Sequence, residues 1–175
     1  MRYPSPMTTR WLDDDERAAW VRLAAVVQLP PGVLESQLRR DADLTHFEYW
    51  VLSMLSEVPT RTLRMTALAA RTSSSLSRLS HVVARLEERG LIERFPCPED
   101  RRATNARLTD LGWSTVVAAA PGHLETVREF VIDALTPRQI TALTGITEAI
   151  LTKIDPDATA TGSYREATGS PAPKR

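Results

Sequence analysis

The stretch from Ser74 to Trp113, SSLSRLSHVVARLEERGLIERFPCPEDRRATNARLTDLGW, decides the fold of this 175-residue chain. Its first part predicts an amphipathic helix from about residue 74 to residue 89, ended by Gly90. The apolar residues of that helix fall at helical spacing: Leu76, Leu79, Val83 and Leu86. Two short extended runs then flank a proline-containing turn, which predicts a β-hairpin. A further helix is expected to begin near Thr109.

Helix starts outside this stretch are marked by capping boxes. In this pattern a capping residue and an acid or amide three positions on bond each other's backbone N–H groups. Three such pairs occur: Asp13 with Glu16, Thr45 with Glu48, and Thr136 with Gln139. The last pair encloses Pro137, which is favoured at a first helical position. The sequence therefore predicts helices that begin at these three points.

The first of these helices carries an interrupted apolar stripe. Its members are Trp20, Leu23, Ala24, Val27, Val33, Leu34 and Leu38. Pro30-Pro31-Gly32 falls within the stripe, and two prolines remove donors and clash with the preceding turn. We therefore expect two helical halves with a kink or short break between them.

The middle of the chain predicts two short helices before the one at residue 74. The helix from Thr45 stops before Pro59 and is expected to bury four apolar residues: Phe47, Val51, Leu52 and Leu55. Thr66 is expected to cap the next helix, with Leu68 and Ala69 directed inward. Together with the helix from residue 74, they give the order helix, short helix, turn, longer helix, hairpin.

The sequence predicts two helices after residue 108 and irregular segments at both ends of the chain. The helix from Thr109 is expected to bend at Pro121-Gly122. The last helix, from Thr136, has an apolar face made of Ile140, Leu143, Ile146, Ile150 and Ile154. Residues 1–10 contain two prolines and no periodicity, which is typical of a flexible arm. Small and polar residues dominate from Asp155 on, which predicts a disordered tail.

Charge is unevenly distributed along the chain. Residues 61–107 hold ten arginines against five acidic residues, a local balance of +5, although the formal net charge of the whole chain is zero. The segments 11–60 and 108–157 carry balances of −5 and −4. A basic middle between acidic ends favours one face built for a polyanion.

Composition excludes several classes of protein. Apolar residues make up 42% of the chain, which suffices for a core, but no apolar run approaches the ~20 residues of a membrane span. The N-terminus shows no secretion signal, and the one cysteine, Cys97, rules out an internal disulfide framework. We therefore expect a cytoplasmic protein, without cofactors and without a membrane partner.

The predicted element order is that of a winged helix-turn-helix. The helix from residue 74 presents short serines and arginine opposite its apolar stripe, a surface that fits the ~12 Å major groove of DNA. The residues predicted to face the groove are Ser74, Ser75, Ser77, Arg78 and His81. The hairpin carries the adjacent pair Arg101 and Arg102 at its turn, placed to reach a phosphate or the minor groove.

In these motifs the chain resembles the MarR family of bacterial transcriptional regulators, from about Trp11 to Lys153. The resemblance rests on LRMTALAART, SLSRLSHVVARLEERGLIER, PCPEDRRATNARLTDLGW, AAAPGHLETV and LTPRQ. It implies a homodimer joined through its N- and C-terminal helices, bound to a pseudo-palindromic operator in double-stranded DNA. The break at residues 30–32 departs from the unbroken first helix that the family resemblance leads us to expect.

The resemblance also implies roles for individual residues. Ser74, Ser75, Ser77, Arg78 and His81 match base-groove positions of the recognition helix. Arg102 matches the wing arginine that enters the minor groove, Asp100 the acid that orients it, and Arg101 a phosphate contact. Arg64 and Arg94 are further candidate phosphate contacts.

Other sites follow less directly from the sequence. The three histidines and Cys97 lack the spacing of a structural zinc site, so no metal is expected. The sequence shows no catalytic Ser/His/Asp arrangement, so no catalysis is expected. Cys97 is either an ordinary thiol or an oxidant sensor tuned by nearby arginines. Four further side chains are either core residues or the walls of a site for a small aromatic or phenolic effector: Trp20, His46, Trp50 and Trp113.

The expected fold is mainly α with a small β-hairpin wing. Its segments are an arm (1–10), N-terminal dimerisation helices (11–44), the DNA-binding domain (45–109), C-terminal dimerisation helices (110–155) and a tail (156–175). The expected function is a homodimeric repressor released from its operator by an effector. The alternative is an effector-independent architectural or protein-partner module with the same fold.

Overall fold

The computed structural model describes residues 9–98 and 100–156, without the side chains of Pro30 and Arg101. Residues 1–8 and 157–175, which hold most of the predicted arm and tail, lie outside this range. Within it, the helices are α1 (Asp14–Ala42), α2 (His46–Ser56), α3 (Met65–Arg71), α4 (Leu76–Glu88), α5 (Asp110–Val127) and α6 (Pro137–Ile154). The strands are β1 (Thr62–Arg64), β2 (Ile92–Cys97) and β3 (Asp100–Leu108).

The three predicted capping boxes are confirmed. The N-cap residues of α1, α2 and α6 are Asp13, Thr45 and Thr136. Each side chain accepts a hydrogen bond from the backbone N–H three positions on, and the side chain at that position accepts one from the N-cap N–H. Ser75 and Thr109 also cap α4 and α5 by accepting from the N–H groups of Arg78 and Gly112. Because these contacts lie within four residues, the sequence alone is enough to predict them.

The predicted break in α1 is wrong, because the helix is continuous through residues 30–32. The missing proline N–H groups leave the carbonyl oxygens of Val26 and Val27 without their usual helical donors. Both residues are exposed within one chain, at 60% and 65%, so they lie outside the core of the chain itself, which lowers the cost of continuing the helix.

Helices α2, α3 and α4 enclose the core in the middle of the chain. Of the four predicted core residues of α2, Val51, Leu52 and Leu55 are fully buried, whereas Phe47 is only half-buried. Leu68 of α3 is fully buried as expected. The prediction that Thr66 caps α3 is wrong: the N-cap is Arg64, without a side-chain hydrogen bond. The path of the chain out of β1, rather than a capping side chain, thus fixes where α3 begins.

Helix α4 buries a slightly different stripe from the predicted one. Leu79, Val83 and Leu86 are fully buried as expected, and Val82 joins them. Leu76 remains 47% exposed, since it is the first residue of the helix and projects past the core. Gly90 ends the helix with a φ of 71°, a backbone conformation that favours glycine.

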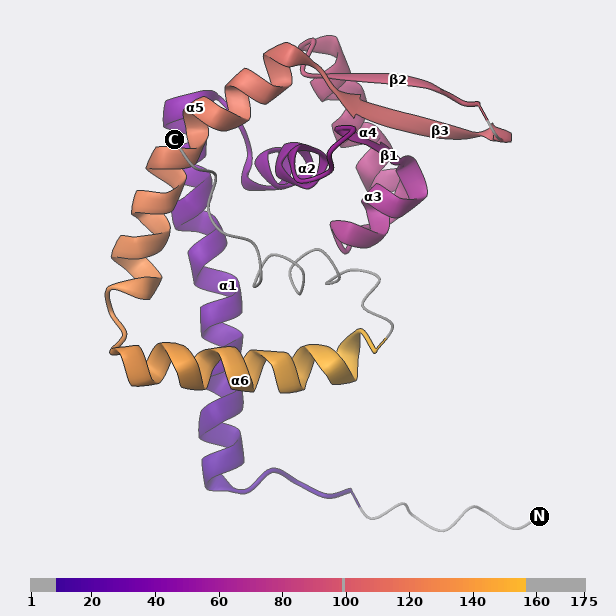
Figure 1. Ribbon diagram of the computed structural model, residues 1–175. Helices are drawn as coiled ribbons and strands as arrows, with labels where there is room; N and C mark the ends of the chain where they lie inside the picture. Colours follow the sequence, from indigo (N-terminus) through magenta and orange to yellow (C-terminus); the bar gives the residue numbers. More distant parts are fainter. Residues whose placement is uncertain (1–8, 99, 157–175) are drawn as a thin grey trace, which may run out of the picture.

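The predicted hairpin is confirmed as β2 and β3, and it belongs to a three-stranded antiparallel sheet in the order β1-β3-β2. The sequence missed β1, which has three residues and pairs Thr62 with Arg107. Figure 1 shows β2 and β3 projecting together from the helices as a wing. We call residues 92–108 the wing and α4 the recognition helix.

The remaining helices flank this region. Helix α5 packs against α1 and α2, runs through Pro121 and passes into a π-helical turn, Arg128–Ile132. It changes direction along its length, and α6 follows it away from the wing (Figure 1). No residue of α6 is buried. Among the described helices, none has the length and apolar character needed to cross a membrane.

Candidate nucleic-acid interface

The exposed face of the recognition helix carries three of the five predicted groove residues. Ser77, Arg78 and His81 are exposed on α4. The other two sit at its start and serve the local fold: Ser74 is half-buried with its Oγ 3.0 Å from Thr72 Oγ1, and Ser75 Oγ accepts from Arg78 N at 3.2 Å. The helix therefore offers a small serine, an arginine and a histidine to a groove.

Two arginines of this face are held by the first turn of α2. The Arg78 guanidinium carbon lies 4.3 Å from the centre of the Phe47 ring. Two helical turns further along α4, Arg85 Nη2 lies 3.4 Å from Glu48 Oε1. Phe47, Arg78 and Arg85 line one hollow, together with Glu35, Thr45, His81 and Val82.

The wing turn is shaped by Asp100. Its Oδ1 accepts a hydrogen bond from the backbone N–H of Arg102 at 3.1 Å. The aspartate thus orders the main chain from which Arg102 projects, and Arg102 is exposed. The side chain of Arg101, predicted as a phosphate contact, lies outside the described atoms.

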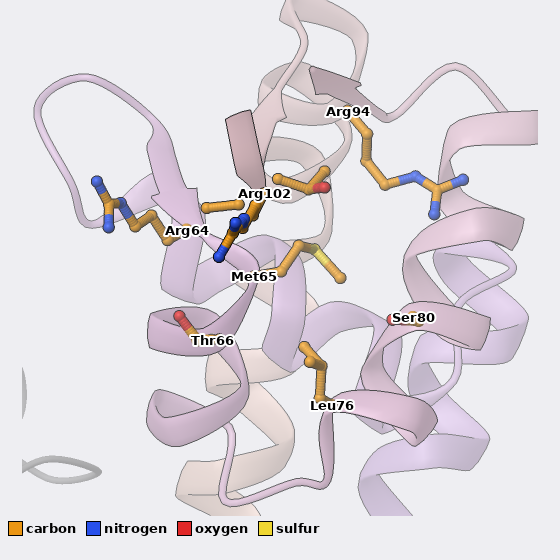
Figure 2. A pocket seen from close by; sticks show the side chains of 9 residues that line it. Arg64, Met65, Thr66, Leu76, Ser80, Arg94 and Arg102 are labelled. Atoms are coloured by element: carbon orange, nitrogen blue, oxygen red, sulfur yellow. The ribbon is translucent and has the colours of Figure 1, made fainter. Parts of the chain in front are cut away.

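A basic hollow joins the wing to the helices. It is lined by Arg64, Met65, Thr66, Leu76, Ser80, Arg94, Arg102, Ala103 and Thr104, and has a volume of about 190 Å³. Figure 2 shows Arg102 over its middle, Arg64 directed to one side and Arg94 toward α4 on the other. Ligand pockets are typically ~300–1,000 Å³, so this hollow favours an extended anion passing over it rather than an enclosed small molecule.

Arg94 is committed to an ion pair within the chain. Its Nε donates to Glu87 Oε2 and its backbone N to Glu87 Oε1, both at 2.9 Å. The hydrogen bond from the Arg94 side chain is the largest cause that holds the pKa of the Glu87 carboxyl below its usual value. A phosphate contact by Arg94 would have to share its guanidinium with Glu87, whereas Arg102 forms no ion pair with an acid in the part of the chain that the structure describes.

The basic stretch is less positive than its sequence suggests. At least five of its ten arginines form ion pairs: Arg61–Asp110, Arg85–Glu48, Arg89–Asp43, Arg94–Glu87 and Arg107–Glu93. Three of these acids come from outside the stretch. The positive charge that this stretch presents is therefore smaller than its ten arginines alone indicate.

The four predicted effector residues do not form one site within a chain. His46 and Trp50 lie together, with ring centres 6.2 Å apart. Trp20 is 59% exposed. It lies 15 residues, or about 22 Å along α1, from Glu35, the residue of α1 whose charge acts on His46. Trp113 packs instead beneath Arg61, whose guanidinium is 4.1 Å from its ring centre.

The sequence missed His123 as the partner of the His46–Trp50 pair. The His123 ring lies 6.4 Å from that of His46 and 4.6 Å from that of Tyr49, so α2 and α5 meet through three rings. His123 Nδ1 and Gln37 Oε1 are buried without a hydrogen-bond partner among the described residues. We call His46, Tyr49, Trp50 and His123 the aromatic junction.

The aromatic junction predicts a pH-dependent stability. Burial lowers the pKa of His46 against an opposing effect of Glu35, and burial followed by repulsion from His46 lowers the pKa of His123. The unfolded chain therefore binds more protons just below pH 6.5, the ordinary value, so the free energy of unfolding should fall as pH drops through this range. Well above pH 6.5 both imidazoles are neutral in the folded and in the unfolded chain, so they no longer make the free energy of unfolding depend on pH.

Urea unfolding between pH 7.5 and 5.5 measures this dependence. The variant His46→Gln with His123→Gln should lose most of it. Glu48 and Glu87, whose pKa values are lowered, act below about pH 4.5 and do not overlap this window. An unchanged slope in the double variant would show that the junction is not its source.

Comparison with known proteins gives consistent matches. A sequence model of the MarR family matches residues 42–103. The MarR family transcriptional regulator Sco3205 from Streptomyces coelicolor, solved in complex with DNA, is 41% identical, with a TM-score of 0.80 over 84% of this chain and 92% of Sco3205. AbsC, a MarR family transcriptional regulator from the same organism, is 38% identical, with a TM-score of 0.78 over 83% of this chain and 98% of AbsC.

A curated relative matches over a shorter range. The uncharacterised HTH-type transcriptional regulator YdcH from Bacillus subtilis (strain 168) is 33% identical over 81 residues, or 45% of this chain. The match spans 55% of the length of YdcH. These relatives are all transcriptional regulators rather than enzymes.

Proposed function

The chain belongs to the MarR family of transcriptional regulators, and we propose that it is a homodimeric repressor of a pseudo-palindromic operator, released by a small-molecule effector. One observation supports the DNA-binding role most strongly. Leu76 and Ser80 of α4 and the wing arginines Arg94 and Arg102 line one basic hollow, in a fold shared with a regulator solved on DNA. In this proposal α4 enters the major groove and Arg102 the minor groove.

Arg78→Ala and Arg102→Ala should impair DNA binding in different ways. Loss of a base contact by Arg78 should cost about 1–3 kcal/mol on the cognate site and relax discrimination there. Loss of Arg102 should weaken binding to many sequences and flatten its salt dependence. Fluorescence anisotropy with cognate and altered duplexes at several salt concentrations measures both effects, and equal, sequence-independent losses would show that the recognition helix is misassigned.

Exposed apolar surface supports the homodimer. Along α6, Leu143, Ile146 and Ile154 are 40%, 58% and 73% exposed, and α1 exposes Trp20, Val21, Val26 and Val27. Soluble chains seldom leave such faces on two helices uncovered. A second copy of the chain covers both in the proposed assembly, which leaves residues 11–44 and 110–155 as the dimerisation segments and residues 45–109 as the DNA-binding domain.

The aromatic junction is the proposed effector site, in place of the four-residue set predicted from the sequence. It combines rings with two unsatisfied polar atoms, Gln37 Oε1 and His123 Nδ1, which suits a small aromatic or phenolic compound with a polar substituent. Release from DNA by a panel of phenolic acids tests this role. If no compound of the panel alters DNA binding or perturbs the aromatic junction, the effector-independent alternative is favoured.

Cys97 is not expected to act as a redox sensor. Its side chain is 2% exposed, and an inaccessible thiol reacts slowly with oxidants. Cys97→Ser should therefore leave DNA affinity and its response to mild peroxide unchanged. If the wild type releases DNA on oxidation and the serine variant does not, the thiol controls binding and the effector hypothesis fails.

A further inference from the structure

The first turn of α2 contacts the outer face of the recognition helix at two points separated by two helical turns. Phe47 lies beneath the Arg78 guanidinium, and Glu48 pairs with Arg85. Residues seven apart share a helix face, so both arginines stand on the side of α4 that carries His81. One short segment thus holds two cations of the proposed groove-facing surface.

This segment is itself rigid. Glu48 Oε2 accepts from Thr45 N at 2.8 Å, and Thr45 Oγ1 accepts from Glu48 N at 3.0 Å, which leaves Glu48 Oε1 for Arg85. The Glu48 side chain is only 7% exposed, yet the hydrogen bonds of Thr45 and the charge of Arg85 outweigh burial and lower its pKa. Glu48 therefore stays ionised and fixed at neutral pH.

Phe47 is placed differently from the fully buried apolar residues of α2. Val51, Leu52 and Leu55 are fully buried, whereas Phe47 is only half-buried and packs at the border of the core. Its core-side contacts hold the ring, and the guanidinium of Arg78 covers the remaining face. A cation above an aromatic face is attracted to it, so a long side chain that is otherwise free to rotate is confined.

We propose that Phe47 is a positioning residue for sequence reading: its ring preorders Arg78 for a guanine edge in the major groove. This inference rests on the proposed DNA-binding function. An arginine confined before binding loses less rotamer freedom when it forms a bidentate contact, so the correct base is favoured more strongly over the others. Phe47 itself does not need to touch DNA.

Phe47→Leu removes the aromatic face and keeps an apolar side chain. On a half-site series in which each base pair is changed in turn, it should reduce discrimination about 2- to 5-fold at the base pair read by Arg78, and nowhere else. The salt dependence should stay unchanged, because no phosphate contact is lost. Phe47→Tyr keeps the ring face and should retain wild-type discrimination.

Two controls separate positioning from a general structural effect. In the Arg78→Ala background, Phe47→Leu should cause no further loss of discrimination. Phe95→Leu removes a ring that lies 5.1 Å beneath another arginine, Arg107, and should not affect the base pair read by Arg78. Thermal unfolding checks each variant, and Phe47→Met replaces Phe47→Leu if the latter does not fold.

The outcomes are distinguishable. If the wild type discriminates between base pairs and Phe47→Leu and Phe47→Met discriminate equally well, the role of Phe47 is overturned and the proposed function is not. So does a uniform loss over all sequences, a loss that persists without Arg78, or tighter binding, which would mean that the ring sequesters Arg78. A wild type that binds all duplexes equally overturns the proposed function and this inference with it.

Discussion

Two glutamates on the apolar face of α6, Leu143→Glu with Ile146→Glu, are expected to convert the dimer into a folded monomer and to weaken operator binding at least about 100-fold. Both side chains are exposed within one chain, so charge there should not disturb the monomer fold. In the dimer the same charges would be buried without partners, which is costly. One winged helix reads only half a site, and the specific affinity of such proteins exceeds their non-specific affinity by ~10³-fold or more.

Light scattering and fluorescence anisotropy measure the two effects together. Thr141→Glu with Gly145→Glu places the same charges on the opposite face of α6 and should leave mass and affinity unchanged. Truncation before Thr136 should act like the Leu143–Ile146 variant, and removal of residues 158–175 should have no effect. A chain that is monomeric from the start and still binds a palindrome tightly would contradict the assembly.

Gly112→Ala is expected to destabilise the fold by about 3 kcal/mol. A Cβ atom at Gly112 would lie 2.1 Å from the carbonyl oxygen of Leu91 and 2.7 Å from Leu108 Cδ1. The nearest of these is backbone, so the clash cannot be relieved by rotating a side chain. Because Leu91 lies three residues after the end of the recognition helix, separation of α5 from this loop should also displace the proposed DNA-binding surface.

Gly145→Ala is the matched control for this substitution. Gly145 also lies inside a helix, but nothing stands within 4 Å of its Cβ position. Alanine loses less backbone freedom on folding than glycine, so this variant should be more stable by about 0.5–1 kcal/mol. Urea unfolding compares the two, and a Gly112→Ala protein as stable as the wild type would mean that α5 and Leu91 are not packed as described.

The parts of the fold that the sequence predicted are those set by near neighbours. The capping boxes at Asp13, Thr45 and Thr136 depend on residues three positions apart, and the stripe of α4 on a repeat within one helix. The wing followed from two extended runs around a single turn. Each pattern carries its own partner within about 20 residues.

The errors arose where the outcome depends on distant packing or on solvent. Strand β1 has three residues and is defined only by its pairing with β3, 45 positions along the chain at Thr62 and Arg107. The Pro30-Pro31 pair interrupts the hydrogen bonds of α1, but the local motif does not show that Val26 and Val27 lie outside the core of the chain. Neither feature leaves a periodic signal in the sequence.

The candidate site divides in the same way. Exposure of Ser77, Arg78, His81 and Arg102 follows from the helix stripe and the hairpin turn, and the structure agrees. The aromatic junction does not follow, because His123 reaches His46 only through the packing of α5 on α2. The contact of Phe47 with Arg78 likewise joins two helices that the sequence predicts separately.

Selection of bound sequences from a random duplex library tests the central claim most directly. The purified full-length chain should enrich an inverted repeat whose half-site centres lie about 34 Å, or one helical turn, apart. Such a repeat requires two recognition helices related by a two-fold axis, and it identifies the base pair for the Arg78 and Phe47 experiments. A library that shows no enriched sequence, or one enriched element without a repeat, would contradict the account.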